Sequence, residues 1–289
     1  MTAYREGTFT AADGLEIYYR DYAAEKAQPL PLLCLPGLTR SSKDFEEFAT
    51  LMSAHRRVLC MDFRGRGRSG RGPSPESYLP TAEFSDIQIL LSTLGLPRIV
   101  FVGTSRGGMV TQLAAYLKPD MVAGAVLNDI GPEASPVGIQ RIMGYAGGVP
   151  PVTNWDEAVK QVKQNNHTQY SKWREEDWQR MTRKLYVMRN GRPVLDYDGQ
   201  VGASLSIPPP PDVSPTFMWD IFKALGKIPT LAIRGGISDL LSEEILAKMV
   251  AAKPDLMTCT VPDQGHVPLL ETPVAFNAIQ ELLRRVDAQ

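Results

Sequence analysis

The sequence has few cysteines, almost no net charge and no long apolar run, and each shortage excludes a class of protein. Only three cysteines occur among 289 residues, in apolar or strand-like runs, so we expect buried free thiols in a reducing compartment and not a disulfide framework. The formal net charge of -1 gives no overall field that would attract nucleic acid or an anionic membrane. No secretion signal is visible near residue 1, and the most apolar stretch is far shorter than the roughly 20 residues that cross a bilayer. We therefore expect a soluble cytoplasmic protein with no nucleic-acid or membrane partner. The oligomeric state, monomer or dimer, stays open.

What the chain does contain is an alternation of short apolar runs with helical patterns. Runs such as those at 98–103 and 122–129 end in glycine or in a charged residue, which is typical of parallel strands buried on both faces. Between them, apolar residues recur at helical spacing, as at Phe84, Ile87 and Leu91. This alternation predicts an α/β fold, a mostly parallel sheet flanked by helices.

The alternation stops after Asp129. From about residue 131 to 226 the sequence offers two amphipathic helical candidates, at 154–164 and 174–187, and all four tryptophans. We interpret 131–226 as a mainly helical cap inserted into a core formed by 1–130 and 227–289. The four prolines at 208–211 predict a stiff, extended connector.

One turn stands out between an apolar run and a helix. Residues 103–107 read Gly-Thr-Ser-Arg-Gly, which matches the nucleophile elbow G-x-S-x-G. In that elbow the serine sits on a strained strand-to-helix turn, and the two glycines are needed because neighbouring backbone passes too close for a side chain. Ser105 is therefore the predicted nucleophile. The alternative is a serine that merely caps the helix between two flexible glycines.

A serine hydroxyl needs a base, and the chain has three histidines. His55 and His167 lie in polar surroundings, whereas His266 lies in a glycine- and proline-bounded loop after the last apolar run. We predict His266 as the base. For the acid that orients it we prefer Asp239, which follows a strand-ending glycine and fits the order serine, acid, histidine. Asp129, at the end of another strand, is the rival acid, or else holds a loop or pairs with Arg106.

Taken in order, the motifs resemble those of the α/β-hydrolase superfamily over nearly the whole chain. The residues that carry the resemblance are LCLPGLTRSS, MDFRGRGRSG, FVGTSRGGM, IRGGISDLL and DQGHVPLL. The resemblance implies the α/β-hydrolase fold with an eight-stranded sheet, and an oxyanion hole formed by the backbone amides of Leu38 and Arg106. A serine nucleophile argues against the haloalkane dehalogenases and epoxide hydrolases of this superfamily, which use aspartate. The role of the Arg106 side chain is left open.

A second glycine motif is misleading. Residues 65–70, GRGRSG, match the dinucleotide fingerprint, but two prolines follow where a helix should begin. The resemblance implies instead a structural loop, with Asp62 and Arg64 packed beneath the site. We predict no cofactor and no metal.

The cap is expected to wall an apolar pocket for a small-molecule ester. The candidates for this wall, each of which could instead belong to the core of the cap, are Met143, Tyr145, Trp155, Trp173, Trp178, Met218, Trp219, Leu240 and Val267. The predicted function is a serine carboxylesterase for short to medium acyl chains, with aryl esters or polyesters as further substrates. The alternatives are a C–C bond hydrolase or enol-lactonase of aromatic catabolism, a lyase, and a non-catalytic ligand-binding protein on the same fold.

Overall fold

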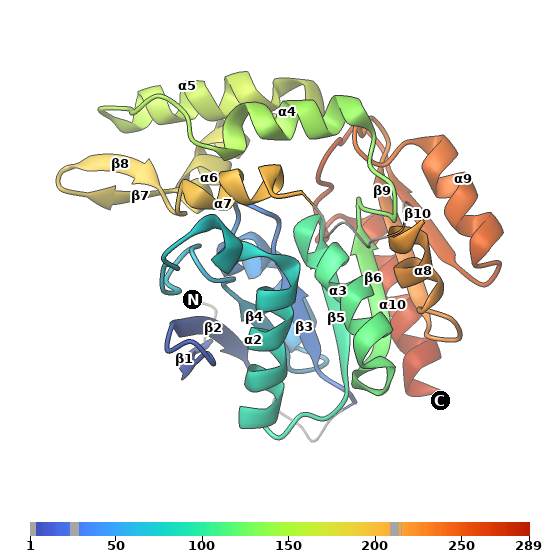
Figure 1. Cartoon of the computed structure of the whole chain (residues 1–289). Helices are drawn as coiled ribbons and strands as arrows, with labels where there is room; N and C mark the ends of the chain where they lie inside the picture. Colours follow the sequence, from blue (N-terminus) through green and yellow to red (C-terminus); the bar gives the residue numbers. More distant parts are fainter. Residues whose placement is uncertain (1–3, 24–28, 209–213, 215) are drawn as a thin grey trace.

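An eight-stranded sheet forms the centre of the molecule (Figure 1). The computed structural model describes residues 4–23, 29–208, 214 and 216–289. The strand order is β1-β2-β4-β3-β5-β6-β9-β10, and all pairs are parallel except β1 with β2 and β2 with β4. The strands are β1 (Arg5–Thr10), β2 (Glu16–Tyr22), β3 (Leu32–Leu35), β4 (Val58–Met61), β5 (Ile99–Thr104), β6 (Val122–Asn128), β9 (Thr230–Gly235) and β10 (Met257–Val261). The predicted α/β-hydrolase fold with a mostly parallel sheet is confirmed.

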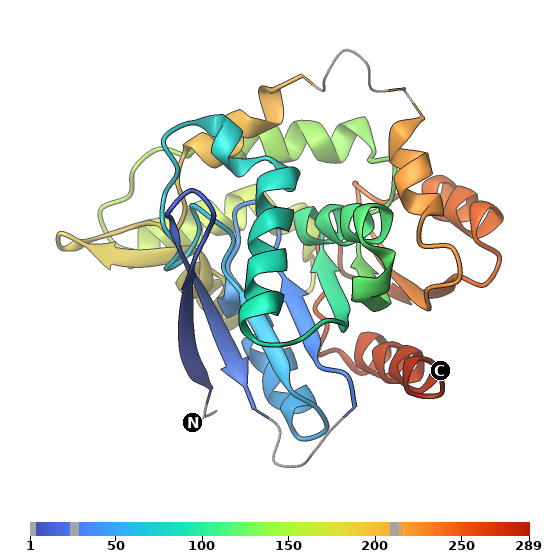
Figure 2. The same ribbon diagram turned by 60° about the horizontal axis from the view of Figure 1, so that its bottom comes forward.

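Helices cover both faces of this sheet because its strands are apolar on both sides. On β5, Phe101 packs into a cluster with α2 and α3, while its neighbours Val100 and Val102 pack into a second cluster with α1 and α10. Figure 2 shows α2 and α3 side by side, with α10 on the other side of the sheet. The helices around the sheet are α1 (Glu46–Ser53), α2 (Pro80–Thr93), α3 (Arg106–Leu117), α8 (Phe217–Lys223), α9 (Glu243–Ala252) and α10 (Pro273–Asp287).

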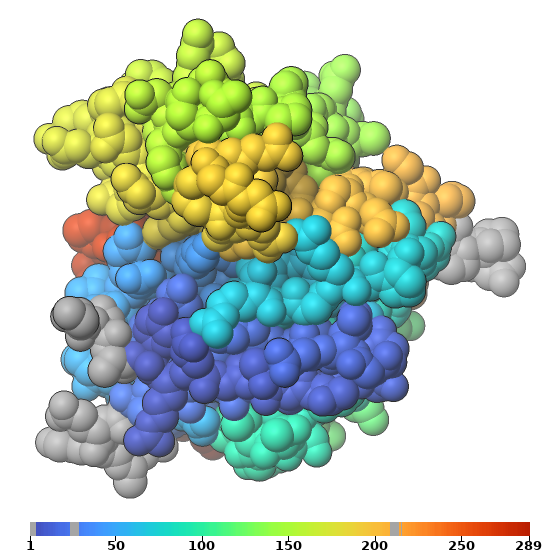
Figure 3. All heavy atoms as spheres, turned by 90° about the vertical axis from the view of Figure 1, so that its left-hand side faces the viewer, coloured from blue at the N-terminus to red at the C-terminus, as the bar shows by residue number. Residues whose placement is uncertain are grey.

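The chain between β6 and β9 forms a separate layer above one end of the strands (Figures 1 and 3). It contains α4 (Pro136–Ala146), α5 (Trp155–Asn166), α6 (Glu175–Leu185), β7 (Tyr186–Arg189), β8 (Arg192–Leu195) and α7 (Gln200–Ala203). We call this layer, residues 136–203, the cap. It has its own apolar cluster, which includes Trp178 and Tyr186. The exact limits 131–226 stay a prediction. Helix α8, inside those limits, packs on α3, and Phe222 belongs to the core cluster beneath.

Three strands of the structure, β1, β7 and β8, were not predicted from the sequence pattern. Strand β1 carries only one buried residue, Phe9, because it lies at the edge of the sheet. The hairpin β7-β8 turns at Asn190 and Gly191, both with positive φ. The proline connector predicted at 208–211 lies almost wholly outside the described residues.

Other predictions can be compared directly with the structure. Cys34, Cys60 and Cys259 are free and buried, as expected. His55 and His167 are exposed. Among the described residues, no helix combines the length and the apolar character needed to cross a membrane.

Candidate active site

Ser105 sits on a strained turn between β5 and α3. Its backbone has φ 50° and ψ -110°, a conformation that residues with a side chain seldom adopt. Both flanking glycines are sterically required. A Cβ at Gly103 would lie 2.5 Å from the carbonyl carbon of Gly107, and a Cβ at Gly107 would clash with the backbone oxygen of Leu35. The turn therefore has the geometry of the predicted nucleophile elbow.

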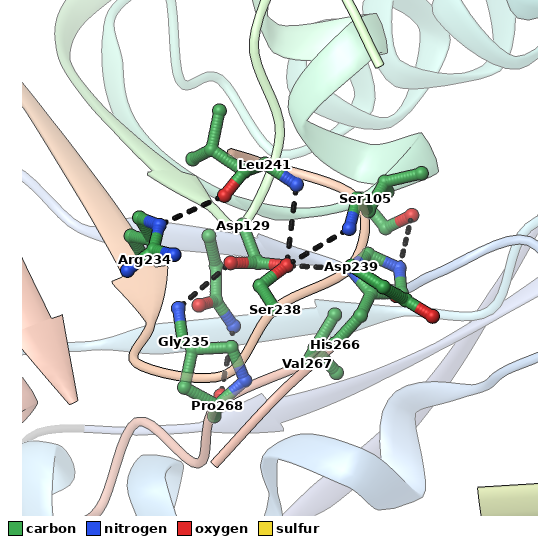
Figure 4. A network of polar contacts seen from close by, with 12 residues as sticks. Ser105, Asp129, Arg234, Gly235, Ser238, Asp239, Leu241, His266, Val267 and Pro268 are labelled. Carbon is green, nitrogen blue, oxygen red and sulfur yellow. Dashed lines mark hydrogen bonds and ion pairs between the residues drawn. The ribbon is translucent and has the colours of Figure 1, made fainter. Parts of the chain in front are cut away.

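His266 lies against the serine. Its Nε2 is 3.0 Å from Ser105 Oγ, which is hydrogen-bonding distance (Figure 4). The histidine comes from the loop between β10 and α10, and it is buried. The structure thus brings together the two residues that the sequence analysis selected, 161 positions apart in the chain.

The acid beside His266 is Asp129. Its Oδ2 lies 2.8 Å from His266 Nδ1, and the side chain is fully buried at the end of β6. Gly235 donates its backbone N–H to Asp129 Oδ1 over 2.7 Å, and Ser238 donates its hydroxyl to Oδ2 over 2.6 Å (Figure 4). Since an ionised carboxylate only accepts hydrogen bonds, Nδ1 carries the proton and Nε2 is free to accept one from the serine.

The structure contradicts the preference for Asp239 as this acid. Asp239 forms a two-pronged ion pair with Arg141 of α4, with distances of 2.6 and 2.9 Å, and it accepts a bond from Gln169. Both aspartates follow strands that end at the same edge of the sheet, so chain order alone does not distinguish them. The rival Asp129 is the one that reaches the imidazole.

Three residues at this site were missed by sequence reasoning. Ser238, directly before Asp239, fixes the carboxylate of Asp129. From the cap, Gln169 Oε1 accepts the backbone N–H of His266 over 2.8 Å, and the hydroxyl of Tyr170 accepts the N–H of Val267 and donates to its carbonyl. These cap residues hold the loop that carries the histidine. Because the contacts join segments almost 100 residues apart, no local sequence signal marks them.

The backbone amides of Leu38 and Arg106 are the oxyanion hole that the sequence resemblance implies. Among the described residues neither amide has a hydrogen-bond acceptor. The two segments are adjacent, because Gly107 donates its N–H to the carbonyl of Pro36 over 3.0 Å. Arg106 also opens α3, so the positive end of the helix dipole points at the serine. An anion formed on a carbonyl next to Ser105 could therefore be received by these amides.

A cavity opens beside Ser105 and His266 between the core and the cap. It contains about 1320 Å³ of empty space, part of which is open solvent. Apolar and aromatic side chains dominate its wall, among them Ile142, Tyr145, Val149, Val162, Tyr170, Trp173, Leu195, Tyr197, Val267 and Leu269. The charged residues of the wall are three cations, Arg40, Arg180 and Lys184, and three anions, Asp44, Asp177 and Glu271, so their formal charges cancel. Such a wall suits a ligand that is mainly apolar.

The predicted pocket residues divide between this cavity and other places. Tyr145 and Val267 line it, and so does Trp173. The remaining candidates do not: Met143 is exposed on the outer side of α4, Trp155 packs inside the cap, and Leu240 belongs to the core. Trp219 donates to Glu133 over 2.6 Å and packs against the core, and Trp178 forms the centre of the cap. Trp155 and Trp178 were misplaced because large apolar side chains of the cap also fill the cap's own core.

Burial changes the ionisation of several groups around the cavity. Burial raises the pKa of the Tyr145 and Tyr170 hydroxyls, so both stay neutral donors or acceptors at physiological pH. Burial also raises the pKa of the Glu271 carboxyl above its usual range.

In the described part of the chain, no group of three or more His, Cys, Asp or Glu side chains is arranged to hold a metal ion.

Comparison with known proteins places this geometry in context. The sequence model of a family described as alpha/beta hydrolase fold matches residues 31–183. The 3-hydroxybutyrate-oligomer hydrolase of Cupriavidus necator is 30% identical over 255 residues, which are 86% of each chain. A solved alpha/beta hydrolase from Novosphingobium aromaticivorans superposes with a TM-score of 0.90 at 39% identity and covers 99% of both chains. A non-heme chloroperoxidase of Streptomyces lividans is 34% identical over 123 residues, or 43% of its own length.

Proposed function

Because the chain belongs to the alpha/beta hydrolase fold family, we propose that it is a serine hydrolase that cleaves carboxylic esters through an acyl-enzyme. The matches establish the coarser assignment, a hydrolase. In this proposal Ser105 is the nucleophile, His266 and Asp129 form the acid–base pair, and the bond cleaved is an ester. The observation that carries it is the line of contacts Ser105 Oγ to His266 Nε2, 3.0 Å, and His266 Nδ1 to Asp129 Oδ2, 2.8 Å.

In the first half of the reaction, His266 Nε2 takes the proton of Ser105 as Oγ attacks the ester carbonyl. A bond forms between Oγ and the carbonyl carbon, and the carbonyl electrons move to oxygen. The amides of Leu38 and Arg106 receive that oxyanion. When the tetrahedral species collapses, the bond to the alcohol oxygen breaks, and the imidazolium returns the proton to the departing alcohol.

The second half repeats the same steps with water. His266 takes a proton from water, the hydroxide attacks the acyl carbon, and collapse releases the acid and restores the hydroxyl of Ser105. Asp129 accepts the Nδ1–H bond throughout, so it holds the ring in the reactive tautomer and stabilises the imidazolium. All of these steps use side chains and amides of this chain.

The cavity wall supports a substrate with an apolar acyl part. Four tyrosines also line the wall, Tyr145, Tyr170, Tyr186 and Tyr197, and they add polar atoms to it without a net charge. The relative from Cupriavidus necator is named for 3-hydroxybutyrate oligomers, in which each repeat is joined by an ester. We therefore propose short hydroxyalkanoate oligomers as the first natural-type substrates to test, beside simple acyl and aryl esters.

The test is hydrolysis of p-nitrophenyl esters from acetyl to long acyl chains, together with 3-hydroxybutyrate dimers and trimers. Wild type and Ser105→Ala are compared, with circular dichroism to establish that the variant is folded. We expect turnover of at least one ester class by the wild type, and a loss of about three orders of magnitude or more in Ser105→Ala.

Two results would contradict the proposal. One is an unimpaired Ser105→Ala variant, because the nucleophile would then be another group. The other is a wild type that releases no acid from any ester but cleaves a carbon–carbon bond of a dienoate or opens an enol-lactone, since the alternatives considered from the sequence would then apply.

A further inference from the structure

A buried ion-pair network lies directly behind the two amides that would receive the oxyanion. Its members are Arg66, Glu83 and Arg106, whose side chains are almost completely shielded from solvent. Arg66 comes from the glycine motif at 65–70, and Glu83 comes from the first turn of α2. The network thus uses a loop to which the sequence assigns only a structural role.

Glu83 joins the two arginines. Its Oε2 accepts from Arg106 Nε over 2.7 Å, and its Oε1 lies 2.9 Å from Arg66 Nη1. Arg106 also donates to the carbonyl of Tyr78. The side chain of the residue that follows the nucleophile is therefore fixed at both ends of its guanidinium. This answers the question that the sequence left open for Arg106.

Arg66 connects the network to the second amide. Its Nε donates to the backbone carbonyl of Leu38 over 2.7 Å, and its Nη1 donates to the carbonyl of Arg64 over 2.7 Å. Burial lowers the pKa of Arg66 to about 10, with Glu83 opposing that effect, so the guanidinium stays charged at neutral pH. The bond fixes the peptide unit that follows Leu38, and because only φ and ψ of Leu38 separate this unit from the Leu38 N–H, it restricts the backbone that carries that amide.

We propose that Arg66 and Glu83 are positioning residues of the oxyanion hole, which hold the Leu38 and Arg106 amides in one fixed relation to Ser105 Oγ. The inference rests on the proposed serine mechanism, because only that mechanism uses these amides. A buried charge is costly unless it is paired, and apolar residues would fill the same space at lower cost. Fixed donors are valuable here because an oxyanion hole works only when its amides need no reorganisation during the reaction.

The network could act instead through its charge alone, and one substitution distinguishes the two roles. Two arginines and one glutamate leave one formal positive charge near the oxyanion. Glu83→Gln raises that local charge and keeps the shape of the side chain, so an effect of charge alone predicts faster oxyanion formation. Loss of position predicts slower formation, because the neutral amide binds both guanidinium groups less firmly.

The experiment measures two rates in wild type, Glu83→Gln and Arg66→Lys. The first is ester turnover, separated into kcat and KM. The second is the rate at which a fluorophosphonate labels Ser105, because its P=O oxygen occupies the oxyanion position as fluoride leaves. The second rate does not require that the natural substrate is an ester. Asp86→Asn is the matched control: it also removes a buried carboxylate from α2, that of the Arg64–Asp86 pair, which has no bond to Leu38 or Arg106 among the described residues.

We expect Glu83→Gln and Arg66→Lys to lower kcat and the labelling rate by roughly tenfold or more, with KM changed by less than about threefold. Asp86→Asn should lower the unfolding midpoint about as much as Glu83→Gln does, because each change removes a buried carboxylate. It should leave the labelling rate of the folded protein unchanged. An unchanged or faster labelling rate in folded Glu83→Gln would overturn the inference, and so would an equal loss in Asp86→Asn. If either variant does not fold, the other decides the result. A wild type that is labelled but cleaves no ester would refute the proposed ester substrate and leave this test intact.

Discussion

Asp129 and His266 meet through a 2.8 Å contact between a carboxylate oxygen and Nδ1, although 137 positions separate them in the chain. The acid therefore comes from the end of β6, the strand next to the one that leads to Ser105. The loop after β9 contributes Ser238 to the support of this carboxylate, and its own aspartate, Asp239, is occupied by Arg141. Ser105, Asp129 and His266 thus follow β5, β6 and β10, and β9 lies between the last two of these strands.

The first prediction separates the two aspartates. Asp129→Asn should lower kcat by about 10³-fold or more, because an amide in this place favours the wrong imidazole tautomer. Asp239→Asn should lower kcat by about threefold at most, since it weakens an ion pair that is partly open to solvent. Steady-state ester hydrolysis by the two variants provides the measurement. An equal loss of kcat in both variants, or a larger loss in Asp239→Asn, would contradict the assignment of Asp129 and favour Asp239 as the acid.

The second prediction concerns the glycine after the nucleophile. Gly107→Ala should lower the free energy of unfolding by about 3 kcal/mol, because the added Cβ would clash with the backbone oxygen of Leu35. The matched control is Gly144→Ala on α4, where an added Cβ meets no atom. That change should raise the free energy of unfolding by about 0.5–1 kcal/mol, since alanine is the better helix former. Urea unfolding of both variants tests this pair, and a Gly107→Ala protein as stable as wild type would show that the elbow has room to relax.

The third prediction tests the bond between the cap and the histidine loop. Tyr170→Phe removes the hydroxyl that accepts the N–H of Val267 and donates to its carbonyl. We expect kcat to fall roughly tenfold while the overall fold is kept, because a small displacement of a catalytic base is costly. Tyr22→Phe is the control, a buried tyrosine on β2 whose hydroxyl contacts Arg20. It should leave kcat unchanged. A Tyr170→Phe enzyme with full kcat would mean that the histidine loop is held without the cap.

The fourth prediction is a dependence of stability on pH. Burial raises the pKa of Glu271 in the folded protein above its ordinary value of 4.5. The folded state thus binds the proton more tightly than the unfolded state, so stability is greatest below pH 4.5 with respect to this group and falls as pH rises through the folded pKa. Glu271→Gln has no carboxyl to ionise, so the variant does not lose this stability as the pH rises. The variant should therefore have a higher unfolding temperature than wild type at pH 7, and the difference should shrink at pH 4. The opposite sign would mean that ionised Glu271 is stabilised, for instance by Lys184 or Arg180.

The sequence was sufficient where the physical constraint is local. The elbow needs glycine at 103 and 107 for reasons that involve its own turn and the next strand, so the pattern predicts Ser105 directly. His266 was found because only three histidines exist and two lie in exposed segments. The helical spacing of Phe84, Ile87 and Leu91 likewise reflects the buried face of α2.

The sequence was insufficient where partners lie far apart in the chain. Choosing between Asp129 and Asp239 requires knowing that Arg141, on a cap helix, occupies the second. The edge strand β1 carries too few buried residues to produce a pattern, and the cap tryptophans could face either the cavity or the cap interior. The network of Arg66, Glu83 and Arg106 links three separate segments, and none of its members is distinctive by itself.

The contacts of Gln169 and Tyr170 with His266 and Val267 have a consequence for chimeras that combine the core of one relative with the cap of another. The segment that shapes the cavity also holds the loop of His266, the proposed base, so exchange of caps between relatives would transfer two properties at once. A chimera would take its substrate range from the donor and would also depend on the donor for the alignment of its histidine. We therefore expect substitutions at Gln169 and Tyr170 to be tolerated less well than substitutions at exposed positions of α4 and α5.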